Sequence, residues 1–202
     1  MRVLAMVVLA GLTMLAVSSS VQSQPQGVAE QKERAAAEEV TPAEYTKTFP
    51  VIAGHGAVVQ LPHAAMQPRS GTRLLVDITR GHDPAELNDA IEKVARFVNL
   101  FAGGGEQPAK VQIAVVFHGD ATLDILKQEA YSSRFNTPIN PNLELLEQLH
   151  STEVQFYVCG QSLISKGGTP EEVAPFVKTA VSAMTAVVNL QTDGYAYLPL
   201  GK

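Results

Sequence analysis

The stretch VQIAVVF at residues 111–117 is almost continuously apolar and rich in β-branched side chains. Such a run is typical of a strand that is covered on both faces, as in a parallel β-sheet. Two further strands are predicted around it, by RLLVDIT at residues 73–79 and by VQFYV at residues 154–158. The long segments that separate these strands leave room for the crossover connections that parallel strands require.

The segments between the strands have the spacing of helices. Leu87, Ile91 and Val94 recur at steps of three and four residues, which places them on one helix face. Asp83 followed by Pro84 is typical of a helix start and predicts that this helix begins there. Alternating strands and helices predict an α/β fold with a mostly parallel sheet and helices on both faces. The remaining predicted elements are helices near residues 121–127, from 140 and at 185–191, a segment at 177–183 that fits a strand or a helix, and a last strand at 195–200.

The N-terminal residues have the order of an export signal. Arg2 precedes residues 3–17, which carry no charge, and small polar residues follow. This order is typical of a secretory signal peptide, and the apolar run is shorter than the roughly 20 residues of a spanning helix. We assign residues 1–23 to the signal, with cleavage between Ser18 and Ser23, and expect a periplasmic or secreted protein without stable membrane insertion after cleavage. The alternative is a protein anchored in the membrane by the uncleaved segment.

Three regions are predicted after the signal. Residues 24–45 are rich in Gln, Ala and Glu and poor in large apolar side chains, so we expect a flexible linker. Residues 46–71 are apolar in part but interrupted by Gly54, Gly56 and several prolines, which favours an extended arm over a central strand. Residues 72–202 are assigned to the α/β domain.

Composition excludes several classes of function. The chain has 202 residues and 15 Lys and Arg against 20 Asp and Glu, and its formal charge of −5 is the opposite of the basic surface that nucleic-acid binding needs. A single cysteine excludes a disulfide within the chain and every CxxC motif. The five histidines form no HxxxH or HExxH pair, and the glycine runs at 103–105 and 167–168 lack the spacing of phosphate loops. We therefore expect no metal site and no cofactor.

Cys159 is the first candidate for chemistry. It follows the strand at 154–158, and ligands of open parallel sheets bind beyond the carboxyl ends of the strands. A helical turn that begins at this point would lower the pKa of the thiol, because free N–H groups would face the sulfur. Gly160 has no side chain and lets another backbone or a sulfur donor come close. The alternative is that Cys159 is a small buried side chain with a packing role alone.

His118 is the second candidate. It ends the strand at 111–117 and precedes Gly119, so the same rule places His118 and the Gly119 backbone on the rim that carries Cys159. Its imidazole could exchange a proton with the thiol, and the alternative is a hydrogen-bonded structural residue. Asp77 lies inside the strand at 73–79 and is expected to point to solvent from an edge strand rather than into the cleft. His82 is expected in a loop near a helix start.

Several longer stretches, taken in their order and spacing, resemble the DsrE/DsrF-like family of sulfur-relay proteins. VQFYVCGQSL at 154–163 with KGGTPEEV at 166–173, and NLQTDGYAYLPL at 189–200, carry most of the similarity. The stretches at 73–100 and 111–126 resemble the first two strand–helix units of the family, so the resemblance covers about residues 72–200. It implies a three-layer α/β/α sandwich with a mostly parallel sheet of about five strands. It also implies homo-oligomers, often trimers or hexamers.

The resemblance also implies a function for one residue. In some members of the family a cysteine receives sulfur as a persulfide and passes it on, and the strand–Cys–Gly pattern of the family falls on Cys159 and Gly160. The predicted function is an exported sulfur carrier of sulfurtransferase type, whose partner is a sulfur donor or acceptor protein. The alternative is a non-catalytic module of the same fold that binds a small ligand or a partner segment, with a structural Cys159. The relay members act in the cytoplasm, whereas a persulfide in an oxidising compartment is exposed to oxidation.

Overall fold

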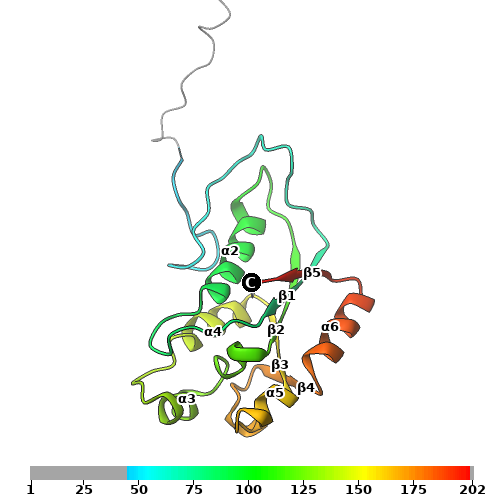
Figure 1. The fold of residues 1–202 in the computed structure, drawn as a ribbon. Helices are drawn as coiled ribbons and strands as arrows, with labels where there is room; N and C mark the ends of the chain where they lie inside the picture. The colour runs from blue at the N-terminus through cyan, green and yellow to red at the C-terminus, as the bar shows by residue number, and fades with distance from the viewer. Residues whose placement is uncertain (1–44, 201–202) are drawn as a thin grey trace, which may run out of the picture. The chain divides into compact units, whose positions relative to one another are not determined.

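A parallel sheet organises residues 45–200, the part of the chain that the computed structural model describes (Figure 1). Within this part the sheet has five strands in the order β4-β3-β2-β1-β5, and every neighbouring pair is parallel. The predicted α/β class and parallel sheet are thereby confirmed, whereas the predicted signal peptide and nearly all of the predicted linker lie outside the described residues. The strands are β1 (Thr72–Ile78), β2 (Val111–Phe117), β3 (Gln155–Cys159), β4 (Val177–Ala180) and β5 (Ala196–Pro199).

Helices cover both faces of this sheet. In Figure 1, α2 (Asp89–Gly103) and α4 (Leu143–Ser151) lie together on one side of the strands, and α6 (Ala183–Thr192) lies on the other. No helix within residues 45–200 combines the length and the apolar character needed to cross a membrane. The connections between strands hold the shorter elements η3 (Gly119–Leu123), α3 (Gln128–Phe135), α5 (Gly160–Ser165) and η4 (Pro170–Glu172).

The start of α2 differs from the prediction. Asp83 does not begin the helix; its carboxylate accepts a hydrogen bond from the Ala85 N–H (2.9 Å), which closes a single separate turn. The cap of α2 is the buried Asn88, whose side-chain oxygen accepts from the Ala90 N–H at 2.8 Å. The Asn88 amide is itself fixed by other buried polar groups, so tertiary contacts and not the local start signal decide where the helix begins.

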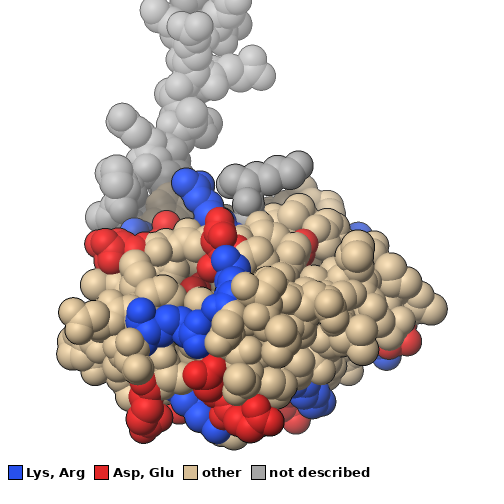
Figure 2. Space-filling model, turned by 60° about the horizontal axis from the view of Figure 1, so that its bottom comes forward, with Lys and Arg blue, Asp and Glu red and all other residues tan. Residues whose placement is uncertain are grey.

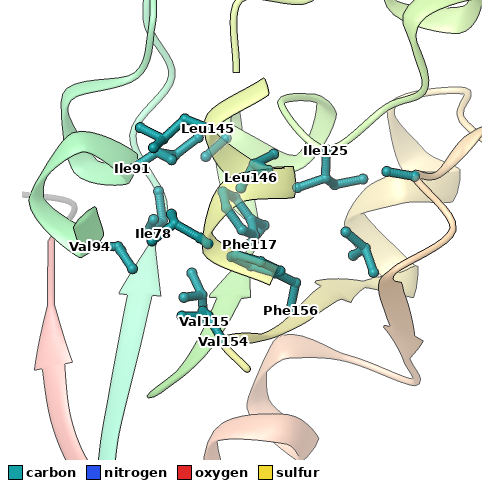
Figure 3. Packing of buried hydrophobic residues seen from close by; sticks show 14 of the residues in the cluster. Ile78, Ile91, Val94, Val115, Phe117, Ile125, Leu145, Leu146, Val154 and Phe156 are labelled. Carbon is teal, nitrogen blue, oxygen red and sulfur yellow. The ribbon is translucent and has the colours of Figure 1, made fainter. Parts of the chain in front are cut away.

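Alternate residues of each strand face opposite helical layers. The layer under α2 and α4 is a large, fully buried core, and Figure 3 shows Ile91 and Val94 of α2 with Leu145 and Leu146 of α4 packed over the strands. The layer under α6 has fewer buried residues, and its strand residues include the small Ala114 and Cys159. Strand residues in the first layer are Val76, Ile78, Ile113, Val115, Phe117, Phe156, Val158 and Val177. Those in the second layer are Leu75, Ala114, Val116 and Cys159.

Residues 51–56, which precede β1, are held against α2 by hydrogen bonds to Asn99. Asn99 of α2 is fully buried, and its side-chain oxygen accepts hydrogen bonds from the Val51 and Ile52 N–H groups, both at 2.9 Å. Its amide donates to the carbonyls of His55 (2.9 Å) and Gly56 (3.1 Å). Gly56 has a φ of +62°, and a Cβ there would lie 2.2 Å from the backbone of the helix. This segment therefore passes as close to α2 as a glycine permits.

Candidate functional site

Four polar side chains meet on the face of the sheet that α6 covers. Asp77 comes from β1, His118 follows β2, Cys159 ends β3 and Tyr197 lies in β5. The parallel register puts Asp77 beside Val116 and Tyr197 beside Leu75, so the alternation of the strands directs these side chains to one face. They line an open cavity of about 390 Å³, which is also bordered by Gln161 of α5 and by Ser182, Ala183, Met184 and Val187 at the start of α6.

Cys159 is the last residue of β3 and the N-cap of α5, so the helix begins at the residue that carries the sulfur. Its Sγ accepts a hydrogen bond from the Ser162 N–H at 3.4 Å. Burial raises the pKa of the thiol, but hydrogen bonds from the Ser162, Ala183 and Gln161 N–H groups and from the Ser162 hydroxyl outweigh it, so the pKa is lowered from its ordinary value. The residue is 6% exposed and borders the cavity. A thiol that ionises readily beside a cavity is suited to nucleophilic attack.

His118 and Tyr197 are both joined to the carboxylate of Asp77. The His118 Nε2 lies 2.8 Å from Asp77 Oδ1, and the Tyr197 hydroxyl donates to Asp77 Oδ2 at 2.6 Å. The hydrogen bond to Asp77 is the main reason why the pKa of Tyr197 rises to about 12, with burial second. Tyr197 therefore stays protonated and keeps its place as a donor.

This arrangement fixes the imidazole of His118. A carboxylate can only accept, so Nε2 carries the hydrogen that Asp77 binds, and in the neutral ring Nδ1 is left as the acceptor. Asp77 thus positions His118 and leaves one ring nitrogen able to take or give a proton. The site has a thiol, a proton acceptor and a residue that orients the acceptor, which is the set of groups that nucleophilic catalysis uses.

The prediction that Asp77 faces solvent from an edge strand is wrong. β1 has β2 on one side and β5 on the other, and Asp77 pairs with Pro199 of β5, so the strand is internal. The residue is 7% exposed. Sequence reasoning missed this because β5 comes from the far end of the chain, and it missed Tyr197 for the same reason. The signal that could have found both is their alternation with the apolar residues of their strands.

The two glycines of the predicted rim have roles in the backbone. A Cβ on Gly160 would lie 2.8 Å from the Ala180 carbonyl oxygen, so this glycine lets α5 begin directly against the end of β4. Gly119 has a φ of +58° and lies close to the Thr79 carbonyl, which lets the chain turn immediately after His118. Both glycines shape the rim, although the residues that line the cavity are their neighbours Cys159, Gln161 and His118.

A second polar cluster lies away from the cavity, between the connections that precede α2 and α4. Asp124 accepts a hydrogen bond from the Asn88 amide at 2.7 Å, and His82 Nδ1 lies 3.6 Å from the other carboxylate oxygen. Burial raises the pKa of Asp124 to about 7, although the Asn88 hydrogen bond opposes this, and burial lowers the pKa of His82. Asn142, which precedes α4, accepts from the Asn88 N–H at 2.9 Å. The cluster therefore joins the starts of α2 and α4.

Metal binding has no geometric support in residues 45–200. No group of three or more His, Cys, Asp or Glu side chains there is arranged so that it could hold a metal ion. His82 lies in the connection before α2, as predicted, and His55 is joined to Glu92 at 2.7 Å. The histidines thus serve separate local contacts.

Comparison with known proteins gives a family. The sequence profile of the DsrE/DsrF-like family matches residues 74–200, which include β1 through β5. Among solved structures, the chain is similar to the protein of unknown function MTH1491 from Methanobacterium thermoautotrophicum, at 19% identity over 63% of this chain and 98% of that chain, with a TM-score of 0.45. No curated protein sequence matches the chain.

Proposed function

The chain belongs to the DsrE/DsrF-like family, and on this premise we propose that it carries sulfur as a persulfide on Cys159. The fold is of the type that sulfur-relay proteins use. The observation that carries the proposal is the environment of the Cys159 sulfur, which borders the cavity at the carboxyl end of the sheet and receives backbone hydrogen bonds that lower its pKa. A cysteine with a packing role alone needs neither feature.

The reaction has two steps of thiol exchange. The Cys159 thiolate attacks the sulfane sulfur of a donor, so that one bond to that sulfur breaks, a new S–S bond forms and the leaving group departs with the electron pair. An acceptor thiolate then attacks the outer sulfur of the persulfide, which releases the Cys159 thiolate. The sulfane sulfur is passed on at the same oxidation level, so no external oxidant or reductant is needed.

His118 is the general acid and base of this reaction. It lines the same cavity as Cys159, and Asp77 holds its Nε2, so Nδ1 is the nitrogen that exchanges a proton with the thiol or with the leaving group. Proton transfer by a positioned imidazole contributes roughly 10²- to 10⁴-fold in rate. Asp77 and Tyr197 act through His118 and are positioning residues.

Export and self-association belong to the same proposal. The uncharged run at residues 3–17 supports export with cleavage between Ser18 and Ser23, which places the carrier in the periplasm or outside the cell. Homo-oligomers, often trimers or hexamers, are what the resemblance to the family implies for the assembly. A sulfur donor or acceptor protein is the further partner that this function requires.

Intact-mass analysis tests the proposal on the full chain. The wild type and Cys159→Ser are incubated separately with thiosulfate and with octasulfur, and each product is then treated with dithiothreitol. We expect the wild type to gain sulfur atoms from at least one donor and to lose them to dithiothreitol, because the added sulfur is held by S–S bonds. Since Cys159 is the single cysteine of the chain, the variant is expected to gain none.

Two outcomes contradict the proposal. If the wild type gains no sulfur from either donor, or if Cys159→Ser gains as much, Cys159 is not a sulfur carrier. The non-catalytic module, in which the same cavity binds a ligand or a partner segment, then becomes the better description.

A further inference from the structure

We infer that the site takes its sulfur from an uncharged sulfane-sulfur donor, such as a cyclic polysulfur molecule, and discriminates against anionic donors such as thiosulfate. The inference rests on the proposed function, because it names the donor for the sulfur that Cys159 would carry. It comes from the chemistry of the cavity wall, which is distinct from the chemistry of the thiol.

The cavity wall offers an anion no free positive charge. Within residues 45–200, neither Lys nor Arg is among the residues that line it. His118 is the basic side chain of this described lining, and its Nε2 already lies 2.8 Å from the carboxylate of Asp77. Asp77 is 7% exposed, so its charge is poorly screened by water and repels a second anion in the cavity.

Most of the side-chain hydrogen-bond donors of the wall already have a partner within the protein, although the Gln161 amide has a second N–H. The Tyr197 hydroxyl donates to Asp77, and the Gln161 amide donates to the Val181 carbonyl at 3.3 Å. Ser182 caps α6, where its hydroxyl lies 2.9 Å from the Thr185 hydroxyl and accepts from the Thr185 N–H at 3.1 Å. A thiosulfate ion that entered would give up hydration and gain few of the charge-assisted hydrogen bonds that anion sites supply.

The remaining wall and the approach to it are apolar. Ala183, Met184 and Val187 of α6 form one side of the cavity. Met184 is 78% exposed, and α6 contains no Asp, Glu, Lys or Arg. In Figure 2, the right part of the visible face, on the side where Figure 1 draws α6, is largely free of charged side chains. An uncharged, apolar donor gains free energy when it leaves water for such a surface.

The chemistry is balanced with octasulfur as the donor. The Cys159 thiolate attacks one ring sulfur, one S–S bond of the ring breaks and one S–S bond to Cys159 forms. The electron pair and the negative charge move to the far end of the opened chain. An acceptor thiolate can then remove sulfur by the same exchange.

The test compares rates of sulfur loading by intact-mass analysis of the full chain. Each rate with octasulfur or with thiosulfate is divided by the rate at which 2-mercaptoethanol reacts with the same donor, which removes the intrinsic reactivity of the donor. Wild-type protein is expected to favour octasulfur over thiosulfate by about tenfold or more on this scale, because the wall repels the anion.

Two lysine substitutions on α6 form a matched pair. Met184→Lys places a cation on the cavity wall, whereas Val188→Lys places the same charge at an exposed position of the helix outside the wall. Both sites are more than half exposed, so both variants are expected to fold. Met184→Lys is expected to speed thiosulfate loading about tenfold and to slow octasulfur loading, because the wall that receives the apolar donor then carries a charge. Val188→Lys is expected to change either rate by less than about twofold, because residue 188 does not line the cavity.

The outcomes separate this inference from the proposed function. If wild-type Cys159 loads from thiosulfate as fast as from octasulfur or faster, relative to 2-mercaptoethanol, the donor class is wrong while the sulfur-carrier function stands. If Met184→Lys and Val188→Lys change thiosulfate loading equally, the cavity wall does not select the donor and the inference is also overturned. If neither donor loads Cys159, the proposed function itself fails.

Discussion

The two faces of the one sheet are built differently, although the same strands supply both. The face under α2 and α4 is filled by large side chains with almost no exposure, such as Phe117, Phe156 and Leu146. The face under α6 is covered by one helix and has Ala114, Ala183 and Ala186 among its buried residues. Asp77, Cys159, His118 and Tyr197 line a cavity on this second face. The larger core on one face therefore contributes most of the buried apolar surface, and the other face holds the cavity with the polar side chains.

The difference between the two faces follows from the alternation of side chains along each strand, which has a period of two residues. In β3, Phe156 and Val158 belong to the first core while Cys159 belongs to the second, and in β1 Val76 and Ile78 belong to the first while Leu75 belongs to the second. A shift of one residue would exchange the two sets, so the pairing register places the thiol on the α6 side. The account therefore predicts that substitutions on the two faces have separable effects.

The largest expected effect is on stability, at Phe117. This side chain is fully buried in the core under α2 and α4, so Phe117→Ala is expected to lower the free energy of unfolding by about 3–5 kcal/mol. Val187→Ala, on the cavity wall, removes a half-buried side chain and is expected to cost less than about 1.5 kcal/mol. Urea unfolding followed by circular dichroism measures both. If both variants lose the same free energy of unfolding, the two faces of the sheet do not differ in their contribution to stability.

A smaller effect, dependent on pH, is expected at Asp124. Its pKa is raised from 3.8 to about 7 in the folded protein, mainly by burial. The folded state therefore favours the protonated carboxyl, and the stability that this contributes is complete below pH 3.8 and is lost as pH rises through about 7. Asp124→Asn removes this titration, and its amide can donate to His82 Nδ1, which has no hydrogen-bond partner within residues 45–200.

Urea unfolding of both proteins between pH 4.5 and 8 measures this effect. The free energy of unfolding of the wild type, relative to that of Asp124→Asn, is expected to fall by a few kcal/mol over this range. The exposed Asp120→Asn is the matched control and is expected to give no such trend. A wild type that parallels Asp124→Asn at every pH would contradict the account. Sulfur loading of Cys159 by Asp124→Asn is expected to match the wild type, because Asp124 does not line the Cys159 cavity.

Much of the fold was predictable from the sequence. The apolar strands β1, β2 and β3 were predicted near their observed positions because β-branched runs of this length are a local signal. The same reasoning placed Cys159 and His118 at the carboxyl edge of the sheet, where both now line one cavity. The segment at 177–183 fitted a strand or a helix, and its first part forms β4 because it pairs with β3.

The features that were missed depend on contacts between distant parts of the chain. The position of Asp77 is decided by β5, which is the last strand in sequence and pairs with β1. α3 was not predicted at all; it has one buried side chain, Tyr131, whose hydroxyl donates to the Pro84 carbonyl at 3.0 Å. A helix of this length is marginal on its own and is stabilised by such tertiary contacts. The cavity likewise exists because α6 packs on strands whose neighbours the sequence does not reveal.

The proposed function depends on the lowered pKa of Cys159, whose sulfur borders the cavity on the α6 face. The most direct test is the rate at which iodoacetamide alkylates Cys159 in the native full chain, measured against pH by intact-mass analysis. We predict native-state alkylation with an inflection at lower pH than that of the same thiol in the urea-unfolded chain, because backbone N–H groups stabilise the thiolate. An inflection at or above that of the unfolded chain, or alkylation that requires unfolding, would contradict this prediction.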